Sequence, residues 1–213
     1  MKMVTFSGID GAGKSTQIAS LKACLRKEGI RFASLSFWDD VAVLTRFREF
    51  VSHRAFKGDR GVGTPESPLH RRDKNVTHWP VTAARFALYL ADSLHLCLVV
   101  RRVARTGVDV VIFDRYISDE LANLPLNSWV ARGFVRLLLS VAPKPDSAFL
   151  IDADPEAARA RKPEYPLDFL GRNRQSYLHL SRIAGNMTIV EPYSIELAQA
   201  KVQEIAMLEL RRP

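Results

Sequence analysis

The sequence has little cysteine, no long apolar run and no histidine spacing typical of a metal site. Its only cysteines, Cys24 and Cys97, fall on the apolar faces of expected helices. We therefore expect buried, reduced thiols and neither a disulfide nor a metal pair. No stretch approaches twenty apolar residues, and the first residues enter a strand directly, which argues against a membrane span and a signal peptide. The expectation is a cytoplasmic protein with no membrane partner.

The overall composition indicates a globular protein. Hydrophobic residues make up 47% of the 213 residues and charged residues 25%, which is enough apolar material for a buried core. The formal net charge of +8 fits either nucleic acid or a substrate that carries several phosphates. The cations are scattered over several expected elements, without an aromatic-rich strand pattern for stacking bases. We favour phosphate substrates and expect no nucleic-acid partner.

Short strands alternate with long helices along the chain. We expect strands rich in Val, Ile and Phe at residues 3–6, 32–37, 108–113, 147–151 and 187–190. Helical patterns cover residues 14–27, 41–51, 81–105, 129–140, 167–183 and 194–210. This alternation is typical of a parallel sheet with helices on both faces. The prediction is an α/β three-layer sandwich with a five-stranded parallel sheet, as one domain over residues 1–213.

A glycine-rich stretch, FSGIDGAGKST, separates the first strand from the first helix. Gly8, four further residues, Gly13, Lys14 and Ser15 form the phosphate-binding loop pattern. Glycines let the backbone aim its amide groups at an anion, and the start of a helix favours phosphate. Lys14 can reach a terminal phosphate, and Ser15 can bind Mg²⁺. A simple glycine-rich linker is the alternative, but the strand before and the helix after supply the context that the motif requires.

A second polar cluster, Asp114, Arg115 and Tyr116, ends the third expected strand in VVIFDRYISDE. Ligands of open parallel sheets bind outside the carboxyl ends of the strands, so this cluster should lie beside the phosphate loop. An aspartate there can help to hold Mg²⁺, and an arginine can grip a phosphate with two hydrogen bonds. An Asp–Arg pair that only caps the strand is the alternative. We favour the functional interpretation because of the nearby phosphate loop.

Two further segments are candidates for covering this site. Residues 56–80 are polar and rich in glycine and proline, which fits a functional cover and a disordered loop equally well. If this loop is a cover, its candidates for gripping phosphate are Arg71, Arg72 and Lys74. In the segment 154–175, Pro155 starts a helix and basic residues gather before two prolines, as in a hinged lid. A solvated helical face explains Arg159 alone equally well.

With FSGIDGAGKST, FDRY and this basic lid-like segment in the same order, the chain resembles thymidylate kinases, nucleoside monophosphate kinases of the P-loop NTPase superfamily. The resemblance also covers TAARFALYLADSLHL, DADPEAARAR, FLGRNRQSYLHL and VEPYSIEL. It implies an enzyme that uses ATP and Mg²⁺ to phosphorylate a nucleoside monophosphate, by default dTMP. Small nucleotides would be its partners, and a homodimer is the candidate assembly.

The resemblance also implies roles for individual residues. Lys14, Asp10, Arg115 and Arg161 would form the catalytic set. Asp10 would face the acceptor sugar hydroxyl, and Arg115 would clamp the acceptor phosphate. Ser15 and Asp114 would lie at the metal. The ATP-binding set would be Gly8, Asp10, Gly11, Ala12, Gly13, Lys14, Ser15, Thr16, Arg161, Pro192 and Tyr193. The acceptor set would be Asp10, Phe86, Tyr89, Ser93, Arg115 and Tyr116.

The chain departs from the family pattern around the acceptor. FWDDVAV stands in place of an Arg-Glu-Pro-Gly-Gly-like stretch, and SDELANLPL replaces a glutamine-containing segment. Ser93 stands where an arginine would contact the pyrimidine base, and the lid lacks an Asp-Arg pair. We expect intact donor machinery and a base held by packing against Phe86, Tyr89 or Tyr116. Two rivals stay open: a kinase of a nucleoside or another uncharged acceptor, and a nucleotide-dependent switch or nucleic-acid-associated ATPase.

Overall fold

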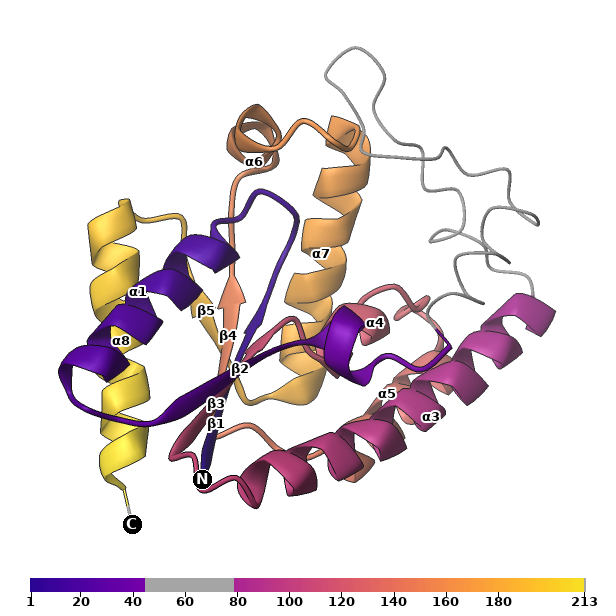
Figure 1. Ribbon diagram of the computed structural model, residues 1–213. Helices are drawn as coiled ribbons and strands as arrows, with labels where there is room; N and C mark the ends of the chain where they lie inside the picture. Colours follow the sequence, from indigo (N-terminus) through magenta and orange to yellow (C-terminus); the bar gives the residue numbers. More distant parts are fainter. Residues whose placement is uncertain (45–78, 213) are drawn as a thin grey trace.

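The computed structural model describes residues 1–44 and 79–212, and in these ranges the strands form a single parallel sheet (Figure 1). The sheet order is β2-β3-β1-β4-β5. The strands are β1 Lys2–Ser7, β2 Phe32–Ser36, β3 Val110–Asp114, β4 Ser147–Ile151 and β5 Met187–Val190. All five strands expected from the sequence are thus confirmed. Because the strands are parallel, the carboxyl ends of β3, β1 and β4 lie next to one another at the same end of the sheet.

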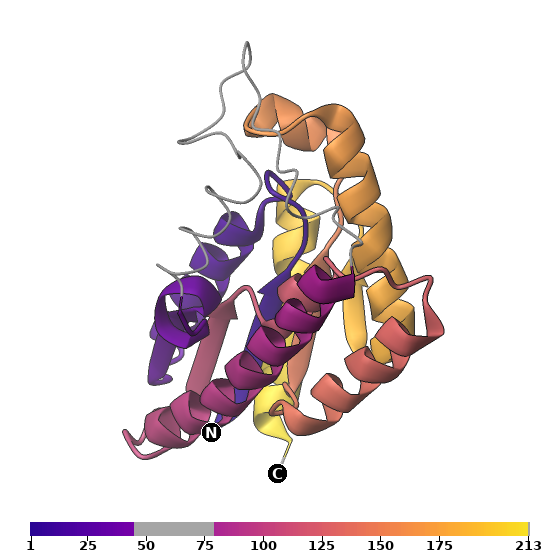
Figure 2. The same ribbon diagram turned by 90° about the vertical axis from the view of Figure 1, so that its right-hand side faces the viewer.

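Helices cover both faces of this sheet, as Figures 1 and 2 show. Helices α1 and α8 pack on one face, and α3, α5 and α7 lie on the other. The helical elements are α1 Lys14–Lys27, a π-helical turn η1 Phe37–Val41, α3 Trp79–Ala104, α4 Ile117–Leu121, α5 Trp129–Val141, α6 Pro155–Arg161, α7 Leu167–Ala184 and α8 Ile195–Arg211. The structure therefore confirms the predicted α/β three-layer sandwich.

The apolar side chains of the central strands β1, β3 and β4 form the core. Phe6 of β1 stacks on Phe149 of β4 with ring centroids 5.3 Å apart, and both side chains are fully buried. Burying one such side chain contributes about 1.5–3 kcal/mol. Strands β1 and β3 each end in a polar residue, Ser7 and Asp114. The core thus fixes the strand ends that carry the polar groups.

Two helices differ from the sequence prediction. The prediction of a helix over residues 41–51 is wrong for its first residues. A π-helical turn, Phe37–Val41, ends at that point, and Ala42 is no longer helical. Its remainder from residue 45, and most of the loop expected over 56–80 with Arg71, Arg72 and Lys74, lie outside the described residues. Helix α4 was not expected at all. Its five residues are too few to show a helical period.

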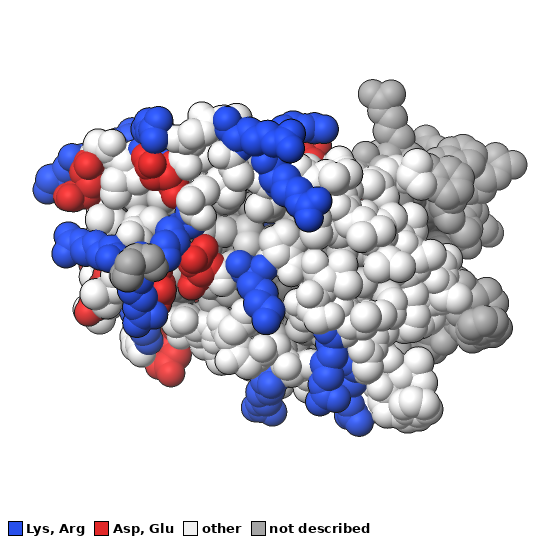
Figure 3. All heavy atoms as spheres, turned by 90° about the horizontal axis from the view of Figure 1, so that it is seen from below, with Lys and Arg blue, Asp and Glu red and all other residues white. Residues whose placement is uncertain are grey.

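Helix α3 carries an apolar surface. Its stretch Thr82–Ala104 is long and apolar enough to cross a membrane by length and composition, with a mean hydropathy of 1.5, although the core helix of a globular protein passes the same test. In this fold α3 packs against η1, α4 and α5. Figure 3 shows mostly uncharged atoms over a large part of the face that α3 crosses. Cys97 of α3 and Cys24 of α1 are free thiols, half-buried where we expected full burial.

Candidate active site

The phosphate loop, residues 8–15, connects β1 to α1 and depends on its glycines. Gly8, Gly11 and Gly13 have φ angles of 140°, 80° and 96°, a region that side chains disfavour. A Cβ on Gly8 would lie 2.4 Å from the carbonyl oxygen of Ile151, and a Cβ on Gly11 would lie 2.2 Å from that of Ala158. The end of β4 and helix α6 therefore pack directly on the loop backbone. Only glycine fits this close approach.

Lys14 lies inside the loop that precedes it. Its Nζ donates to the carbonyl oxygens of Gly8 and Ile9, at 2.8 and 2.9 Å, and the residue is buried. Burial and the nearby Arg115 lower the pKa of Lys14 to about 8, although Asp10 and other carboxylates oppose this shift. The ammonium group is thus held, poorly hydrated, at the centre of the loop. It can form strong contacts with a phosphate placed there.

Arg115 lies beside the loop in a strained backbone conformation. Its φ angle is +67°, rare for a residue with a side chain, and its amide donates to Phe6 O of β1 at 2.9 Å. Its Nη2 pairs with Asp10, and its Nη1 lies 3.3 Å from Asp119. Burial lowers the pKa of Arg115, but Asp119 and Asp10 outweigh burial and raise it above its ordinary value. The structure thus brings Asp10 and Arg115, both predicted from the sequence, into direct contact.

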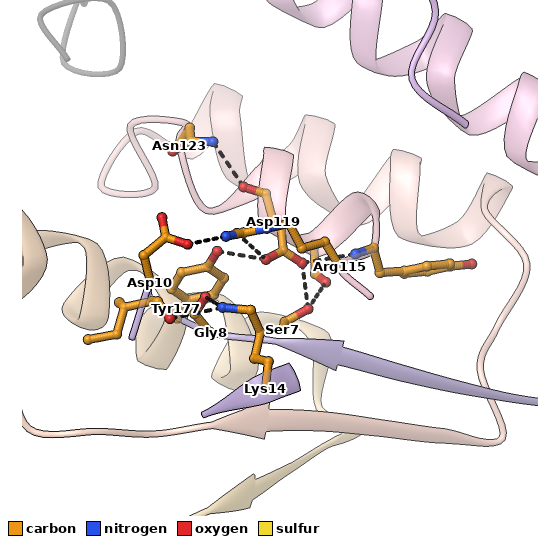
Figure 4. A network of polar contacts seen from close by, with 11 residues as sticks. Ser7, Gly8, Asp10, Lys14, Arg115, Asp119, Asn123 and Tyr177 are labelled. Carbon is orange, nitrogen blue, oxygen red and sulfur yellow. Dashed lines mark hydrogen bonds and ion pairs between the residues drawn. The ribbon is translucent and has the colours of Figure 1, made fainter. Parts of the chain in front are cut away.

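Asp119 and Tyr177, which were not predicted from the sequence, complete this polar network (Figure 4). The Tyr177 hydroxyl of α7 donates to Asp119 Oδ1 at 2.8 Å. The Ser7 hydroxyl donates to Oδ2 at 2.7 Å. Burial and the adjacent carboxylate raise the pKa of Tyr177 well above its ordinary value, so it stays a donor. The sequence held one signal for the contact between Arg115 and Asp119, because oppositely charged residues four positions apart can form an ion pair.

The predicted metal-binding residues lie at the edge of the same loop. Ser15 and Thr16 are exposed at the start of α1, and Asp114 is half-buried at the end of β3. In the sheet, Asp114 pairs in register with Phe6, two residues before Gly8. No cluster of three or more His, Cys, Asp or Glu ligands occurs among the described residues. A hydroxyl, a carboxylate and phosphate oxygens are nevertheless the oxygen ligands that Mg²⁺ accepts.

Helix α6 of the lid-like segment lies over the phosphate loop, as its contact with Gly11 requires. Arg161 ends this helix, is exposed, and donates from Nε to Ala157 O at 3.0 Å. A Cβ on Gly13 would lie 3.8 Å from Arg161 Nη1. Arg161 therefore stands next to the loop, where the sequence analysis expected a basic group.

An ion pair not predicted from the sequence joins the two ends of the lid-like segment to the sheet. Arg174 of α7 donates through Nε and Nη2 to the two carboxylate oxygens of Asp152, at 2.7 and 2.6 Å. Hydrogen bonding to Asp152 raises the pKa of Arg174. Asp152 directly follows β4, and α6 begins three residues later. The pair ties α7 to the strand end from which α6 emerges.

The four residues expected to contact the acceptor base form what we call the base cluster: Phe86, Tyr89, Ser93 and Tyr116. The Phe86 ring stacks on Phe134 of α5, with centroids 3.9 Å apart. Tyr89 and Ser93 are buried, and the Ser93 hydroxyl donates to Tyr89 O at 2.8 Å. The Tyr116 hydroxyl donates to the carbonyl of Pro143, and burial raises its pKa. Their described contacts are thus with the protein interior, and contact with a base stays a prediction.

The residues expected beside adenine lie after β5. Pro192 and Tyr193 are exposed in the short link between β5 and α8. The Lys201 ammonium of α8 lies 5.2 Å from the centre of the Tyr193 ring, a distance that allows a cation–π contact. This link follows the carboxyl end of β5, and the phosphate loop follows the carboxyl end of β1 at the same end of the parallel sheet. Its position fits a nucleotide site, and its role stays a prediction.

Known proteins with similar sequences cover nearly the whole chain. It is 31% identical over 214 residues to a thymidylate kinase of Clavibacter michiganensis. This alignment covers 99% of this chain and 87% of the relative. It is 30% identical to a thymidylate kinase of Leifsonia xyli, over 95% of this chain and 90% of the relative. A thymidylate kinase of Bifidobacterium longum is 28% identical over 94% of both chains. No family model matches the chain.

Proposed function

The chain belongs to the thymidylate kinase family, and we propose that it transfers the γ-phosphoryl group of ATP to dTMP in the presence of Mg²⁺. The observation that carries this proposal is the position of Lys14 and Arg115. Buried Lys14, at the start of α1, and half-buried Arg115, directly after β3, converge at one glycine-rich loop. Transfer between two anions requires that both are held close together and that their charge is neutralised.

On the donor side, the phosphate loop fits the phosphates of ATP. Its glycines leave the backbone free of side chains, and the start of α1 offers unpaired amide groups to an anion. Lys14 would exchange its bonds to Gly8 O and Ile9 O for bonds to phosphate oxygens. A Mg²⁺ ion held by Ser15, and by Asp114 directly or through water, would neutralise phosphate charge. Pro192 and Tyr193 would lie beside the adenine.

On the acceptor side, Arg115 would grip the phosphate of dTMP, and Asp10 would face its sugar hydroxyl. Asp10 now holds the Nη2 side of Arg115, so an arriving phosphate would take over that side. Arg161, at the end of α6, would neutralise charge that develops during transfer. The base cluster, Phe86, Tyr89, Ser93 and Tyr116, would hold thymine by packing.

A phosphorylation screen tests this function. Purified protein, ATP and Mg²⁺ are incubated with dTMP, other nucleoside monophosphates and thymidine, and the products are separated. We expect phosphorylation of dTMP and little of thymidine. Efficient phosphorylation of thymidine with inert monophosphates would replace the proposal with a nucleoside kinase. ATP hydrolysis that needs no small acceptor and rises with nucleic acid at physiological salt would favour a nucleic-acid-associated ATPase, since purely electrostatic binding fades as salt rises.

We further propose that the protein is a cytoplasmic homodimer that binds no nucleic acid. The surface of α3 supports the dimer, because Leu90, Leu94 and Leu98 are spaced by four residues on one helical face and are 37%, 55% and 54% exposed. Two free thiols fit a reducing compartment. Sedimentation velocity tests the dimer: Leu94→Lys should give monomers, and a wild-type protein that sediments as a monomer overturns it.

A further inference from the structure

Asp119 is a buried carboxylate that the proposed catalytic and ligand-binding residues leave without a role. The residue is 5% exposed, and both carboxylate oxygens accept hydrogen bonds. Oδ1 accepts from Tyr177 and from Arg115 Nη1, at 2.8 and 3.3 Å. Oδ2 accepts from the Ser7 hydroxyl and the Tyr116 amide, at 2.7 and 2.9 Å. A buried charge persists only when it is paired and hydrogen-bonded in this way.

The four donors come from three parts of the fold, because Arg115 and Tyr116 are adjacent in the chain. Ser7 ends β1, Tyr116 precedes α4, and Tyr177 belongs to α7. Figure 4 shows the Asp119 side chain between Ser7, Tyr177 and Arg115. The Asn123 side chain also donates to the backbone carbonyl of Asp119, at 2.9 Å. Asp119 is therefore held from three sides and has little freedom to move.

The two carboxylates that contact Arg115 differ in how exposed they are to solvent. Asp119 binds Nη1 and is anchored by three other donors, and its side chain is 3% exposed. Asp10 binds Nη2 from the phosphate loop, and its side chain is 16% exposed. A phosphate that competes for the guanidinium meets a fixed contact on one side and a more accessible contact on the other.

We propose that Asp119 is a positioning residue that fixes the guanidinium of Arg115 through Nη1, so that its Nη2 side faces the acceptor phosphate. Asp10 is the contact that gives way when the phosphate binds. A two-point grip on phosphate requires a fixed guanidinium plane, and Asp119 supplies that orientation. This inference rests on the proposed function, because it assigns Arg115 to the acceptor phosphate.

The substitution Asp119→Asn tests the inference, because it keeps the shape of the side chain and removes its charge. We expect kcat/KM for dTMP to fall by about 10²-fold, the effect of a small misplacement of a reacting group, while the KM for ATP stays unchanged. The matched control is Asp109→Asn. Asp109 also pairs with an arginine, Arg31, but is exposed at the opposite edge of the sheet. The control should behave as wild type.

A double-mutant cycle distinguishes positioning from a general structural role. If Asp119 acts through Arg115, Asp119→Asn should change kcat/KM for dTMP by less than about threefold when Arg115 is already lysine. Losses that multiply in the double variant, or an equal loss of ATP binding, overturn the inference. If wild type does not phosphorylate dTMP, the proposed function itself has failed.

A second variant covers the case in which Asp119→Asn does not fold. Tyr177→Phe keeps the carboxylate and removes one of its four donors. We expect the KM for dTMP to rise by about three- to tenfold with an unchanged KM for ATP, and this effect should also disappear in the Arg115→Lys background. A Tyr177→Phe protein with wild-type constants for both substrates overturns the inference.

Discussion

The phosphate loop and the base cluster lie in the same protein but are built from different interactions. Around the loop, Lys14 and Arg115 are held by carbonyl and carboxylate oxygens. In the base cluster, rings stack on rings and the Ser93 hydroxyl bonds to the backbone of its own helix. Under the proposed function, fixed charges would therefore serve phosphate recognition, whereas the base cluster would contribute mainly shape. Substitutions that separate these two properties test the difference.

The largest effect should come from Lys14→Ala, which removes the central charge of the loop. Turnover should fall by about 10²- to 10³-fold, because a positioned donor in a water-poor site typically contributes that much. Steady-state kinetics measures the loss, and circular dichroism checks the fold. The control is Lys144→Ala, which removes an exposed lysine and should leave turnover unchanged. Near wild-type turnover in Lys14→Ala would remove Lys14 from the mechanism.

The next effect concerns Arg115→Ala. Turnover of dTMP, dUMP and dCMP should fall to a similar extent, by about 10²-fold, because the lost contact is to the phosphate and not to the base. Thermal unfolding should accompany the kinetics, because the substitution leaves Asp119 buried without its cation. Arg31→Ala, which breaks an exposed ion pair, is the control. Unchanged turnover together with good phosphorylation of thymidine would favour the nucleoside-kinase rival.

The third effect is a dependence of kcat/KM for ATP on pH, which arises from Lys14 in the phosphate loop. The pKa of Lys14 falls from 10.5 to about 8, and phosphate binding requires the charged form. The value of kcat/KM for ATP should therefore decrease above about pH 8, by up to about tenfold per pH unit. In Lys14→Arg, which keeps its charge, this decrease should be absent. A pH profile that is the same in both proteins would assign it to another group.

The same shift has a consequence for stability, with a definite sign. Below about pH 8 Lys14 is charged in both the folded and the unfolded protein, and burial of the charge opposes folding. Between about pH 8 and 10.5 only the unfolded protein keeps the proton, so the contribution of Lys14 to stability rises with pH. In urea titrations of the nucleotide-free proteins, the stability of wild type should therefore rise relative to that of Lys14→Met across this range.

Local sequence patterns predicted the strands and the phosphate loop because their signals are local. Glycine spacing, a strand of apolar residues and an amphipathic helix are all visible within about thirty residues. The approach of Arg115 to Asp10 was also predictable in outline, since parallel strands end at one edge. Their direct ion pair in the structure agrees with that expectation.

The network around Asp119 was not predictable in the same way. It depends on Tyr177, a residue 58 positions later in the chain, and on a helix too short to show periodicity. The pair between Asp152 and Arg174 likewise joins a strand end to the middle of another helix. Contacts of this kind depend on how α7 packs against α4 and α6, which single-sequence patterns do not specify.

The smallest effect should come from Ser93→Ala. The Ser93 side chain is fully buried, and its hydroxyl already donates to Tyr89 O, a local bond that serine often makes in helices. We expect kcat/KM for dTMP, dUMP and dCMP to change by less than about threefold each. Ser181→Ala is a matched control, because the Ser181 hydroxyl, largely buried in α7, also donates to a carbonyl of its own helix. A base preference lost only in Ser93→Ala would show that Ser93 reads the base.

The preference of the wild-type protein for dTMP over dUMP and dCMP sharpens the same test. A site that holds the base by packing should separate dTMP from dUMP and dCMP by no more than about 10²-fold, whereas a site built on hydrogen bonds can reach about 10⁴-fold. Competition between paired acceptors at equal concentration measures this ratio directly. A ratio near the higher value, unchanged by Ser93→Ala, would mean that a polar group outside the base cluster recognises the base. A ratio near the lower value would support a site in which the base is held by packing and Arg115 grips the phosphate of every acceptor alike.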